Sequence, residues 1–356
     1  MGYKDKIDLH RFHKYSTNLV DSADNLRPIA TLNQIQLRQS NDVYEHACNI
    51  TGWQQLYNQI QPGEFSGYVK EGWIEGIQFF KEYTSKLVQQ KCMVWPGAIW
   101  IGIPVPNNSE HGMIGHNELA DNLVGIQIGG QEFGLNTPDD YTILGLVVDL
   151  SLLESYFEVF LQRPLPLKHL ASQMTIAMQP TDKLRLCNTI EVLLEMAQHT
   201  PHILNNEATL KTLRYDLLDL LDLLFHNIDQ SPRIVLPKSR LNHINIVQKA
   251  HEFILDNARC RDEMTILDIC EYLHISRRTL QTAFNNIWHV SPVTYLKAIK
   301  LNAVRRELKS PYSEFITVQD AAMAWGFWHM GQFSQDYQSL FKERPSQTLN
   351  QRLRFH

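Results

Sequence analysis

The sequence has few of the features that mark membrane, secreted or metal-dependent proteins. No run of about 18 apolar residues occurs, so no membrane-spanning helix is expected. The N-terminus, MGYKDKIDLHRFHKYS, is polar and lacks the apolar core of a signal peptide. The cysteines (Cys48, Cys92, Cys187, Cys260 and Cys270) form no CxxC pair and no zinc-like spacing, which favours reduced thiols in a cytoplasmic protein. The lack of a glycine-rich phosphate loop, a nucleophile elbow and an HExxH motif argues against catalysis.

The chain also lacks the overall positive charge that is typical of nucleic-acid-binding proteins. Its 356 residues hold 33 Lys and Arg against 38 Asp and Glu, a formal net charge of −5. The charge is unevenly shared, because residues 237–356 hold 16 Lys and Arg against 11 Asp and Glu, a net charge of +5. The first 236 residues hold 17 against 27, a net charge of −10. This asymmetry favours a basic reading domain joined to an acidic sensing domain, although an uneven scatter of surface charge would look the same.

The length predicts two or three domains, and the N-terminal part reads as β-rich. Residues 1–40 are polar and aperiodic and predict an N-terminal arm. Residues 44–149 hold short runs of β-branched and aromatic residues between Gly, Pro and Asn clusters, which favour a small β-barrel or sandwich. Residues 150–228 show the three- and four-residue apolar spacing of helices. We therefore expect a ligand-sensing domain over 41–230, a linker over 231–241 and an α+β fold class for the whole chain.

Individual elements can be placed within this region. The runs 73–80, 92–95, 98–104 and 141–148 are each strand-like. In the helix expected over 207–226, leucines form a broad apolar face that favours either packing on its own domain or a homodimer seam.

The C-terminal region contains the same pattern twice, at a separation of 52 to 53 residues. Each copy opens with a Thr-x-x-Asp helix cap and has a small residue on the first helix, a turn and a second amphipathic helix. The corresponding positions are Thr265, Asp268, Cys270, His274 and Phe284 in the first copy and Thr317, Asp320, Ala322, Gly326 and Tyr337 in the second. This duplication predicts an all-α domain over 242–356 with two helix-turn-helix motifs, joined by a helix from Pro292 to Lys309.

In a helix-turn-helix the second helix enters the major groove of DNA, so its outward residues are the candidate contacts. Apolar anchors (Ile275, Leu280 and Phe284, then Phe333 and Tyr337) set which side faces outward. The candidate DNA-binding residues are Arg277, Arg278, Thr279, Gln281, Thr282, His329, Met330, Gln332, Ser334, Gln335 and Lys300. Arg binds guanine bidentately and Gln suits adenine, so the first copy is expected to supply more sequence-specific energy. Candidates for phosphate attraction are Lys297, Lys300, Arg305, Arg306 and Lys342.

Over roughly 244–352 the chain resembles the DNA-binding domain of the AraC/XylS family of bacterial transcription regulators. The resemblance is carried by Ala321–Phe327, Phe333, Tyr337 and Pro345 in the second copy, by Cys270, Ser276, Leu280 and Phe284 in the first, and by Pro292, Tyr295, Leu296 and Leu301 between them. His289 and Lys342 stand where that family has glycine, Lys300 where it has arginine and Arg344 where it has threonine. The departures lie at turns and helix ends and leave the local loop geometry open.

The chain resembles one member of this family more closely, through Ser276–Gln281, Leu301–Leu308 and Trp325–Phe333. This closer resemblance also reaches the N-terminal half through Asp42–His46, Val94–Pro96 and Thr137–Gly145. It implies a cytoplasmic activator that senses ethanolamine together with adenosylcobalamin and recruits RNA polymerase to ethanolamine utilization genes. The chain lacks a cobalamin-binding Asp-x-His-x-x-Gly motif, so any cobalamin contact would use another arrangement.

Other functions stay open at this point. A small cationic alcohol needs an aromatic wall and a carboxylate, and the candidate ligand-binding residues are Trp73, Glu75, Trp95, Trp100 and Glu110. The signal could instead be a sugar, an aromatic acid or a siderophore. A metal-dependent enzyme would need converging ligands, and between residues 44 and 149 only His46, His111 and His116 occur. We expect no catalytic cofactor and no metal site.

Overall fold

The computed structural model describes residues 35–105, 110–200, 206–226, 237–257 and 264–354. The chain divides into two compact units. The first comprises residues up to Tyr57 and Ser66–Arg233. The second comprises the short segment Asn58–Phe65 and residues from Ile234 to the C-terminus.

The first unit contains two antiparallel sheets that face each other. The seven-stranded sheet has the order β1-β3-β4-β11-β6-β9-β12, and the five-stranded sheet has the order β2-β5-β10-β7-β8. The strands are β1 Gln36–Ser40, β2 Gln54–Gln59, β3 Gly67–Ile74, β4 Ile77–Thr84, β5 Val88–Met93, β6 Ala98–Pro104, β7 Gly112–Ile114, β8 Asn117–Leu119, β9 Leu123–Ile128, β10 Phe133–Thr137, β11 Tyr141–Asp149 and β12 Thr175–Ala177. This arrangement confirms the α+β class with an N-terminal β-domain followed by helices.

The run 73–80 is not one strand but a hairpin. Ile74 on β3 pairs directly with Ile77 on β4, and Trp73 pairs with Gln78. The two residues between the strands form the turn, in which Gly76 has a φ of 77°. Glycine adopts this left-handed conformation without steric cost, and tight two-residue hairpin turns require it.

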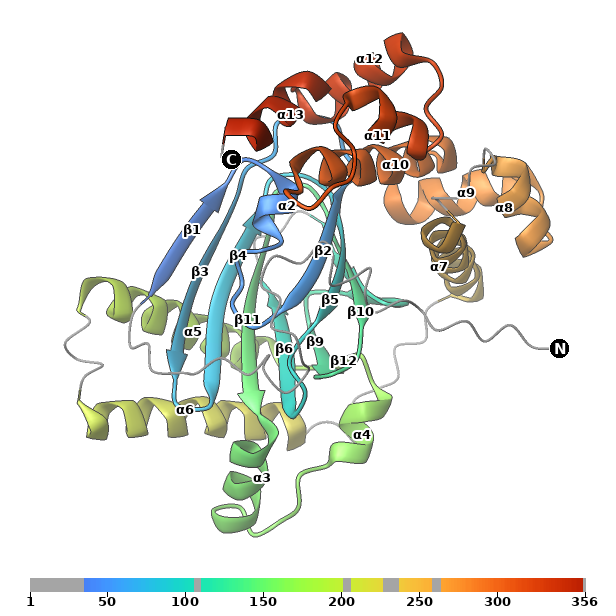
Figure 1. Ribbon diagram of the computed structural model, residues 1–356. Helices are drawn as coiled ribbons and strands as arrows, with labels where there is room; N and C mark the ends of the chain where they lie inside the picture. The colour runs from blue at the N-terminus through green and yellow to red at the C-terminus, as the bar shows by residue number, and fades with distance from the viewer. Residues whose placement is uncertain (1–34, 106–109, 201–205, 227–236, 258–263, 355–356) are drawn as a thin grey trace, which may run out of the picture. The chain divides into compact units, whose positions relative to one another are not determined.

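Helices cover the outer face of the seven-stranded sheet (Figure 1). They are α3 Leu150–Val159, α4 Leu167–Ser172, α5 Pro180–His199 and α6 Glu207–His226, and a short helix α2, Val43–His46, precedes β2. Ile99 and Ile101 of β6 are buried in one apolar cluster with Leu217 and Leu221 of α6. The leucine face of α6 therefore packs mainly on its own domain, which leaves less of it for a homodimer seam.

Three elements fall outside the boundaries expected from the sequence. Strand β1 lies inside the polar arm expected over 1–40. Its polar residues gave no strand pattern in the sequence, because the contacts that stabilise it are distant: it pairs with β3, and Arg38 lies 2.7 Å from Glu71. Strand β12 interrupts the stretch 150–228 that was expected to be helical, where it pairs with β9. Helix α7 begins at Lys238, inside the expected linker. Residues 1–34 of the expected arm and residues 231–236 of the expected linker lie outside the described residues.

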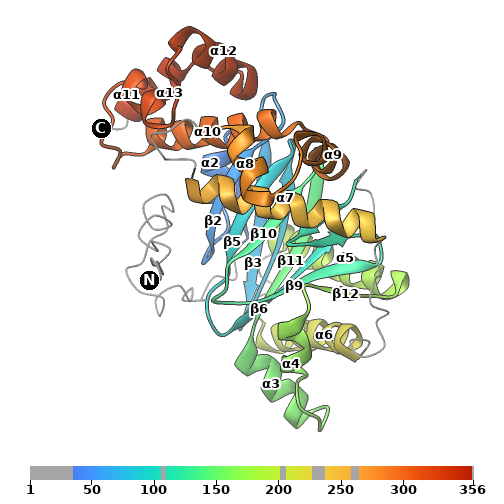
Figure 2. The ribbon, with the colours of Figure 1, turned by 90° about the vertical axis from the view of Figure 1, so that its right-hand side faces the viewer.

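The second unit is helical apart from its short N-terminal segment. Its helices are α7 Lys238–Asn257, α8 Ile266–Leu273, α9 Arg277–Trp288, α10 Pro292–Lys309, α11 Val318–Ala324, α12 Met330–Phe341 and α13 Pro345–Arg354. Within this unit, α9 lies at one end of the long helix α10, and α11 and α13 lie at the other (Figure 2). The two helix-turn-helix motifs expected from the sequence, α8–α9 and α11–α12, are therefore both present. Across the described ranges, none of the helices is long and apolar enough to cross a membrane.

Replacing His289 with glycine should stabilise this unit by about 0.5–1 kcal/mol. His289 ends α9 with a φ of 52°, a left-handed conformation that costs a residue with a Cβ atom roughly 1–2 kcal/mol. Glycine removes that conformational cost. It also has more conformational entropy in the unfolded chain, which offsets part of the gain in stability. Urea unfolding of the full chain measures the effect. His289→Ala keeps the Cβ atom and should show no such gain; an equal gain would contradict the explanation.

Candidate nucleic-acid interface

Both motifs begin with a capped helix, as the sequence predicts. Thr265 accepts a hydrogen bond from the Asp268 amide at 3.4 Å, and Asp268 accepts one from the Thr265 amide at 2.6 Å. The hydrogen bonds from the Thr265 amide and hydroxyl hold the pKa of Asp268 below its usual value. In the second motif the Asp320 amide donates to the Thr317 hydroxyl at 3.1 Å. These bonds satisfy backbone N–H groups that a helix start otherwise leaves without partners.

The turns of the two motifs also carry equivalent hydrogen bonds. The Ile275 amide donates to the Cys270 carbonyl at 3.0 Å, and the Phe327 amide donates to the Ala322 carbonyl at 3.1 Å. His274 and Gly326, the residues just before these donors, both have positive φ, 53° and 80°. The first turn thus adopts the left-handed conformation even without glycine. Matching caps and matching turns show that the sequence repeat is a structural repeat.

Buried anchors fix the orientation of the second helix in each motif. Leu280 and Phe284 of α9 are fully buried, and the Phe284 ring lies 5.4 Å from that of Tyr295 on α10. Phe333 and Tyr337 of α12 are buried in the same way. Because residues three and four apart share one helix face, the opposite faces of α9 and α12 point outward.

The outward face of α9 carries the expected hydrogen-bonding groups. Arg277, Arg278, Gln281 and Thr282 are exposed, and Thr279 is half-buried at the helix start. Gln281 donates to the Asn285 side chain on the next turn at 3.0 Å, and the Thr282 hydroxyl donates to the Arg278 carbonyl at 2.9 Å. Arg278 and Gln281 therefore lie on one exposed face, as base contacts in a major groove require.

The outward face of α12 is less basic. His329, Gln332 and Gln335 are exposed, whereas Met330 and Ser334 are half-buried. Gln332 donates to Asp336 at 3.1 Å. The structure adds one residue that the sequence reasoning did not select: Trp328, directly before His329, is 48% exposed. The signal in the sequence is the position of this tryptophan, directly before the start of a reading helix. Its exposure is evident only in the structure.

The phosphate candidates separate into two groups. Arg305 and Arg306 are buried rather than exposed, which corrects the expectation that they attract phosphates. The Arg305 guanidinium lies 2.7 Å from Glu343, and Arg306 donates to the Asn58 side chain at 2.7 Å. Helix α10 is buried on all sides between Leu301 and Leu308. Arg305 and Arg306 therefore bind partners inside the unit instead of facing solvent.

The remaining basic side chains stay accessible to different degrees. Lys342 is exposed, and Lys297 lies 2.9 Å from Asp336 on α12. Lys300 is half-buried, and its ammonium lies 3.5 Å from the position that a Cβ atom on Gly326 would occupy. Lys300 thus places a positive charge at the turn of the second motif.

Two residues that the sequence reasoning did not select support this arrangement. Asn302 of α10 exchanges two hydrogen bonds with the backbone of Gln59, accepting at 2.9 Å and donating at 2.7 Å. Arg352 of α13 donates to the carbonyls of Glu307, Ser310 and Phe315, at the end of α10 and in the loop that follows. Backbone partners of this kind leave no pattern in the sequence.

The candidate ligand residues of the first unit do not form one group. The Trp73 and Trp95 rings lie 5.5 Å apart, and Trp100 is buried between the two sheets. Glu75 is 85% exposed and lies 2.5 Å from Arg214 of α6. Glu110 is exposed.

The histidines considered for a metal site have separate environments. His46 is buried and lies 3.1 Å from Glu82. His111 is exposed and lies 2.8 Å from Glu118 and 3.3 Å from Asp121, and His116 is exposed. Within the described ranges, no group of three His, Cys, Asp or Glu side chains is arranged to hold a metal ion.

Comparison with known proteins points to one family. The model of a helix-turn-helix domain matches residues 269–351, which run from the middle of α8 into α13 and include all of the second motif and most of the first. The XylDLEGF operon transcriptional activator 3 of Pseudomonas putida is 31% identical over 105 residues, which are 30% of this chain and 31% of that protein. The C-terminal part of this chain is similar to the helix-turn-helix domain of AraC/XylS-type transcription regulators. The helix-turn-helix family model lies wholly within the C-terminal domain.

Two further AraC/XylS relatives extend the comparison. The XylDLEGF operon transcriptional activator 1 of Pseudomonas putida is 27% identical over 168 residues, 46% of each protein. A solved structure of a probable AraC family transcriptional regulator from Rhodopseudomonas palustris shares 30% identity and covers 30% of this chain and 97% of that one, with a TM-score of 0.28. The chain spans less than half the length of these two Pseudomonas relatives.

Proposed function

We propose that this protein is a DNA-binding transcription activator that reads its site with α9 and α12. The observation that carries the proposal is the structural repeat, in which two motifs with equivalent caps and turns are joined by α10. Two reading helices in one chain can enter successive major-groove turns, about 34 Å apart, without a second subunit. The exposed Arg278 and Gln281 offer the groups that recognise guanine and adenine.

We further propose that the N-terminal domain senses a small molecule, and that this molecule is ethanolamine acting together with adenosylcobalamin. The support is the resemblance of Asp42–His46, Val94–Pro96 and Thr137–Gly145 to the activator of the ethanolamine utilization operon. On this proposal residues 41–230 form the sensing domain and residues 242–356 form the DNA-binding domain. The protein would then act in the cytoplasm and recruit RNA polymerase to its operon.

An AraC/XylS regulator with a different effector is the second candidate. The named Pseudomonas relatives activate another operon, and their matches cover only 30% and 46% of this chain. A similar reading domain is compatible with any effector, because the signal is sensed elsewhere in the chain. A metal-dependent enzyme in the β-domain is a third candidate, and a stoichiometric metal in the purified protein would support it.

A homodimer is compatible with this proposal but is not required by it. Leu184 and Val192 on α5 are about half exposed, at 51% and 53%, and offer an apolar surface for a second copy. Sedimentation of the full chain, with and without DNA, tests this directly. A monomer on a single site would show that one chain supplies both reading helices.

Footprinting on the DNA beside this protein's own gene tests the activator proposal. We expect protection of two adjacent major-groove turns, and a change in protection when ethanolamine and adenosylcobalamin are both present. Calorimetry with each ligand alone and with both tests the effector. Protection without heat from any ligand combination would retain the DNA-binding proposal and reject the ethanolamine assignment.

Lys300→Ala should weaken binding to all DNA sequences by a similar factor. The Lys300 ammonium lies at the turn before α12 and has no base specificity, so it acts as a phosphate contact. Loss of one such contact lowers the slope of log K against log salt by about 0.9. Titrations of specific and random duplexes at several salt concentrations measure both effects. Lys249→Ala, which removes an exposed charge from α7, is the control and should leave the slope unchanged.

A further inference from the structure

A short segment from the N-terminal half of the sequence belongs to the second unit. The segment Asn58–Phe65 starts with the last two residues of β2 and ends before β3, yet it groups with the C-terminal helices. Asn58, Gln59, Ile60 and Phe65 are all buried. Surface loops rarely bury their residues in this way. The second unit is therefore built from two stretches of sequence that lie far apart in the chain.

Helix α10 binds this segment through the side chain of Asn302. That side chain accepts a hydrogen bond from the Gln59 amide at 2.9 Å and donates to the Gln59 carbonyl at 2.7 Å. It also donates to the Ala298 carbonyl, one turn earlier on α10, at 2.8 Å. Asn302 is 2% exposed, and a buried amide is costly unless its groups are paired. The backbone of the segment supplies that pairing, which explains a polar residue in the buried part of α10.

The same segment binds the last turn of α12. The Gly63 amide and the Gln59 side-chain amide both donate to the Leu340 carbonyl, each at 3.0 Å. Leu340 is among the last four residues of α12, whose carbonyls have no partner within the helix itself. The Gln59 side chain also donates to the carbonyls of Gln61 and Gly63, both at 2.8 Å. The segment therefore caps the C-terminal end of the second reading helix.

The position of this end matters because α12 is short and reads DNA with its other end. It has 12 residues, a length of roughly 18 Å. The buried anchors Phe333 and Tyr337 fix which face points outward, and the bonds to Leu340 fix the far end. Contacts in a binding site have to be held to within about 0.5 Å and 10–20°. A shift of the Leu340 end would therefore displace His329 and Gln332 relative to the bases.

The two reading helices are supported differently. Helix α9 packs against α7, α8 and α10, whereas α12 packs against α11 and α13. The segment Asn58–Phe65 adds its hydrogen bonds to the end of α12 and to α10. A change in this segment should therefore disturb the second motif and spare the first. This difference separates a positioning role from a general effect on stability.

We propose that Gln59, in the N-terminal half of the sequence, positions α12 for reading DNA. Gln59 is a positioning residue, because it is buried and acts through the Leu340 carbonyl instead of touching a base. This inference rests on the proposed reading of DNA by α12 and adds a part of the N-terminal half to it. Gln59 is also the last residue of β2, so a strand of the proposed sensing domain leads directly into the segment that holds α12.

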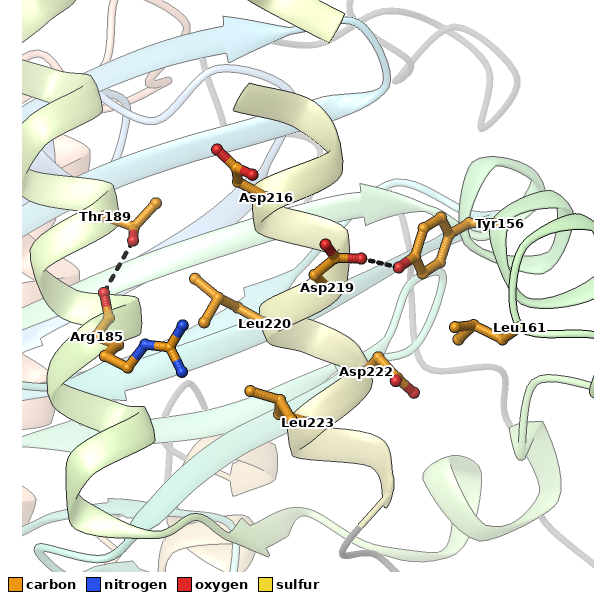
Figure 3. Close-up of a pocket in the computed structure, with 9 residues that line it drawn as sticks. All are labelled: Tyr156, Leu161, Arg185, Thr189, Asp216, Asp219, Leu220, Asp222 and Leu223. Carbon is orange, nitrogen blue, oxygen red and sulfur yellow. Dashed lines mark hydrogen bonds between the residues drawn. The ribbon is translucent and has the colours of Figure 1, made fainter. Parts of the chain in front are cut away.

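A pocket of the first unit offers a control in a different part of the chain. It has a volume of about 450 Å³ and lies between α3, α5 and α6 (Figure 3). Tyr156 binds Asp219 there, and Arg163 binds Asp222, so these carboxylates have partners within the first unit. Asp216 also lines the pocket, and every residue that lines it belongs to the first unit. Asp216→Asn should therefore leave DNA reading unchanged.

The test uses footprinting and competition titrations of the full chain carrying Gln59→Met. Methionine is similarly long and unbranched but cannot donate a hydrogen bond, so the Leu340 carbonyl keeps only the Gly63 amide. Arg278→Ala and Gln332→Ala identify the base positions that α9 and α12 read. We expect Gln59→Met to lower the affinity for the specific site about five- to tenfold, at the lower end of what losing one bidentate base contact costs. The loss should be confined to the positions that α12 reads.

Two controls and a second variant accompany this test. Gln90→Met removes a fully buried glutamine from β5 in the first unit and, like Asp216→Asn, should leave base preference unchanged at all positions. Circular dichroism checks that each variant is folded. If Gln59→Met is unfolded, Asn302→Ala replaces it, because it removes both side-chain bonds to the Gln59 backbone. In the folded variant without DNA, amide exchange in the last turn of α12 should be faster than in the wild type.

The outcomes separate this inference from the proposed function. Equal losses at the positions read by α9 and α12 would overturn the inference, because a general loss of stability acts on both motifs. An unchanged affinity would overturn it too, as would a higher affinity, which would mean that the segment restrains α12. Wild-type protein that protects no DNA would reject the proposed function together with the inference, whereas two turns that respond alike would reject the inference alone.

Discussion

Arg278→Ala should lower the affinity for the specific DNA site by about 1–3 kcal/mol and relax the base preference at one position. Arg278 lies in the first turn of α9, is exposed and shares its face with Gln281. A guanidinium in that position can bind the two acceptors of guanine at once, and alanine leaves them unpaired. Competition titrations against a set of single-base variants of the site measure both effects.

The control for this variant is Arg240→Ala, which removes an exposed guanidinium from α7, outside both motifs. It should leave the base preference unchanged. If Arg278→Ala left the base preference intact, the proposed facing of α9 would be wrong, even if the affinity fell.

Gln281→Ala should cost a similar free energy, whereas changes in α12 should cost less. Gln281 already donates to Asn285, so the amide has to turn toward a base when DNA binds. On α12, Gln332 donates to Asp336, which is itself paired with Lys297, and His329 is the first outward residue. We therefore expect α9 to supply more of the sequence-specific binding energy than α12. His329→Ala and Gln332→Ala should each lower the affinity for the specific site less than Gln281→Ala does.

The helix-turn-helix motifs could be predicted from the sequence because their determinants are local. A Thr-x-x-Asp cap, a small residue before the turn and apolar anchors three to four residues apart fix helix ends and faces within about 20 residues. The structure shows the same caps at Thr265 and Thr317 and the same buried anchors. Even His274 follows the pattern, because the surrounding hydrogen bonds hold it in the conformation that glycine adopts freely.

The buried polar cluster of Gln55, Tyr57 and Glu82 could not be predicted because its residues imitate a solvent-facing strand. Gln55 and Tyr57 alternate with other residues on β2, as Glu82 does on β4, and such alternation usually marks one wet face. Which face is buried depends on the second sheet, which is distant in sequence. The carboxylates expected to bind a ligand, Glu75 and Glu110, both lie at the surface in the fold.

The same limit explains the buried arginines of α10. Arg305 and Arg306 look like solvated charges in the sequence, because nothing near them shows that Glu343 and Asn58 will contact them. Partners that are distant in the sequence decide whether a basic side chain is buried in an ion pair or is free to bind a DNA phosphate. For Arg305 this distinction can be measured.

Arg305→Ala should lower the free energy of unfolding of the second unit by about 3 kcal/mol. The Arg305 guanidinium donates to the Tyr337 hydroxyl at 3.1 Å and to Glu343 at 2.7 Å, and it lies 4.5 Å above the Phe341 ring. Burial raises the pKa of Tyr337 to about 12, so its hydroxyl stays protonated and needs its partners. Alanine leaves the largely buried Glu343 carboxylate without its cation, and that loss exceeds what the missing contacts alone would cost.

Urea unfolding of the full chain, followed by amide exchange in α10 and α12, measures this loss. Arg305→Lys keeps the charge without the planar fork and should lose less. The double variant Arg305→Met with Glu343→Gln removes both charges and should recover much of the stability, because replacing both partners of a buried ion pair costs far less than removing one. Unchanged stability in Arg305→Ala, together with a flatter salt dependence of DNA binding, would instead make Arg305 a phosphate contact.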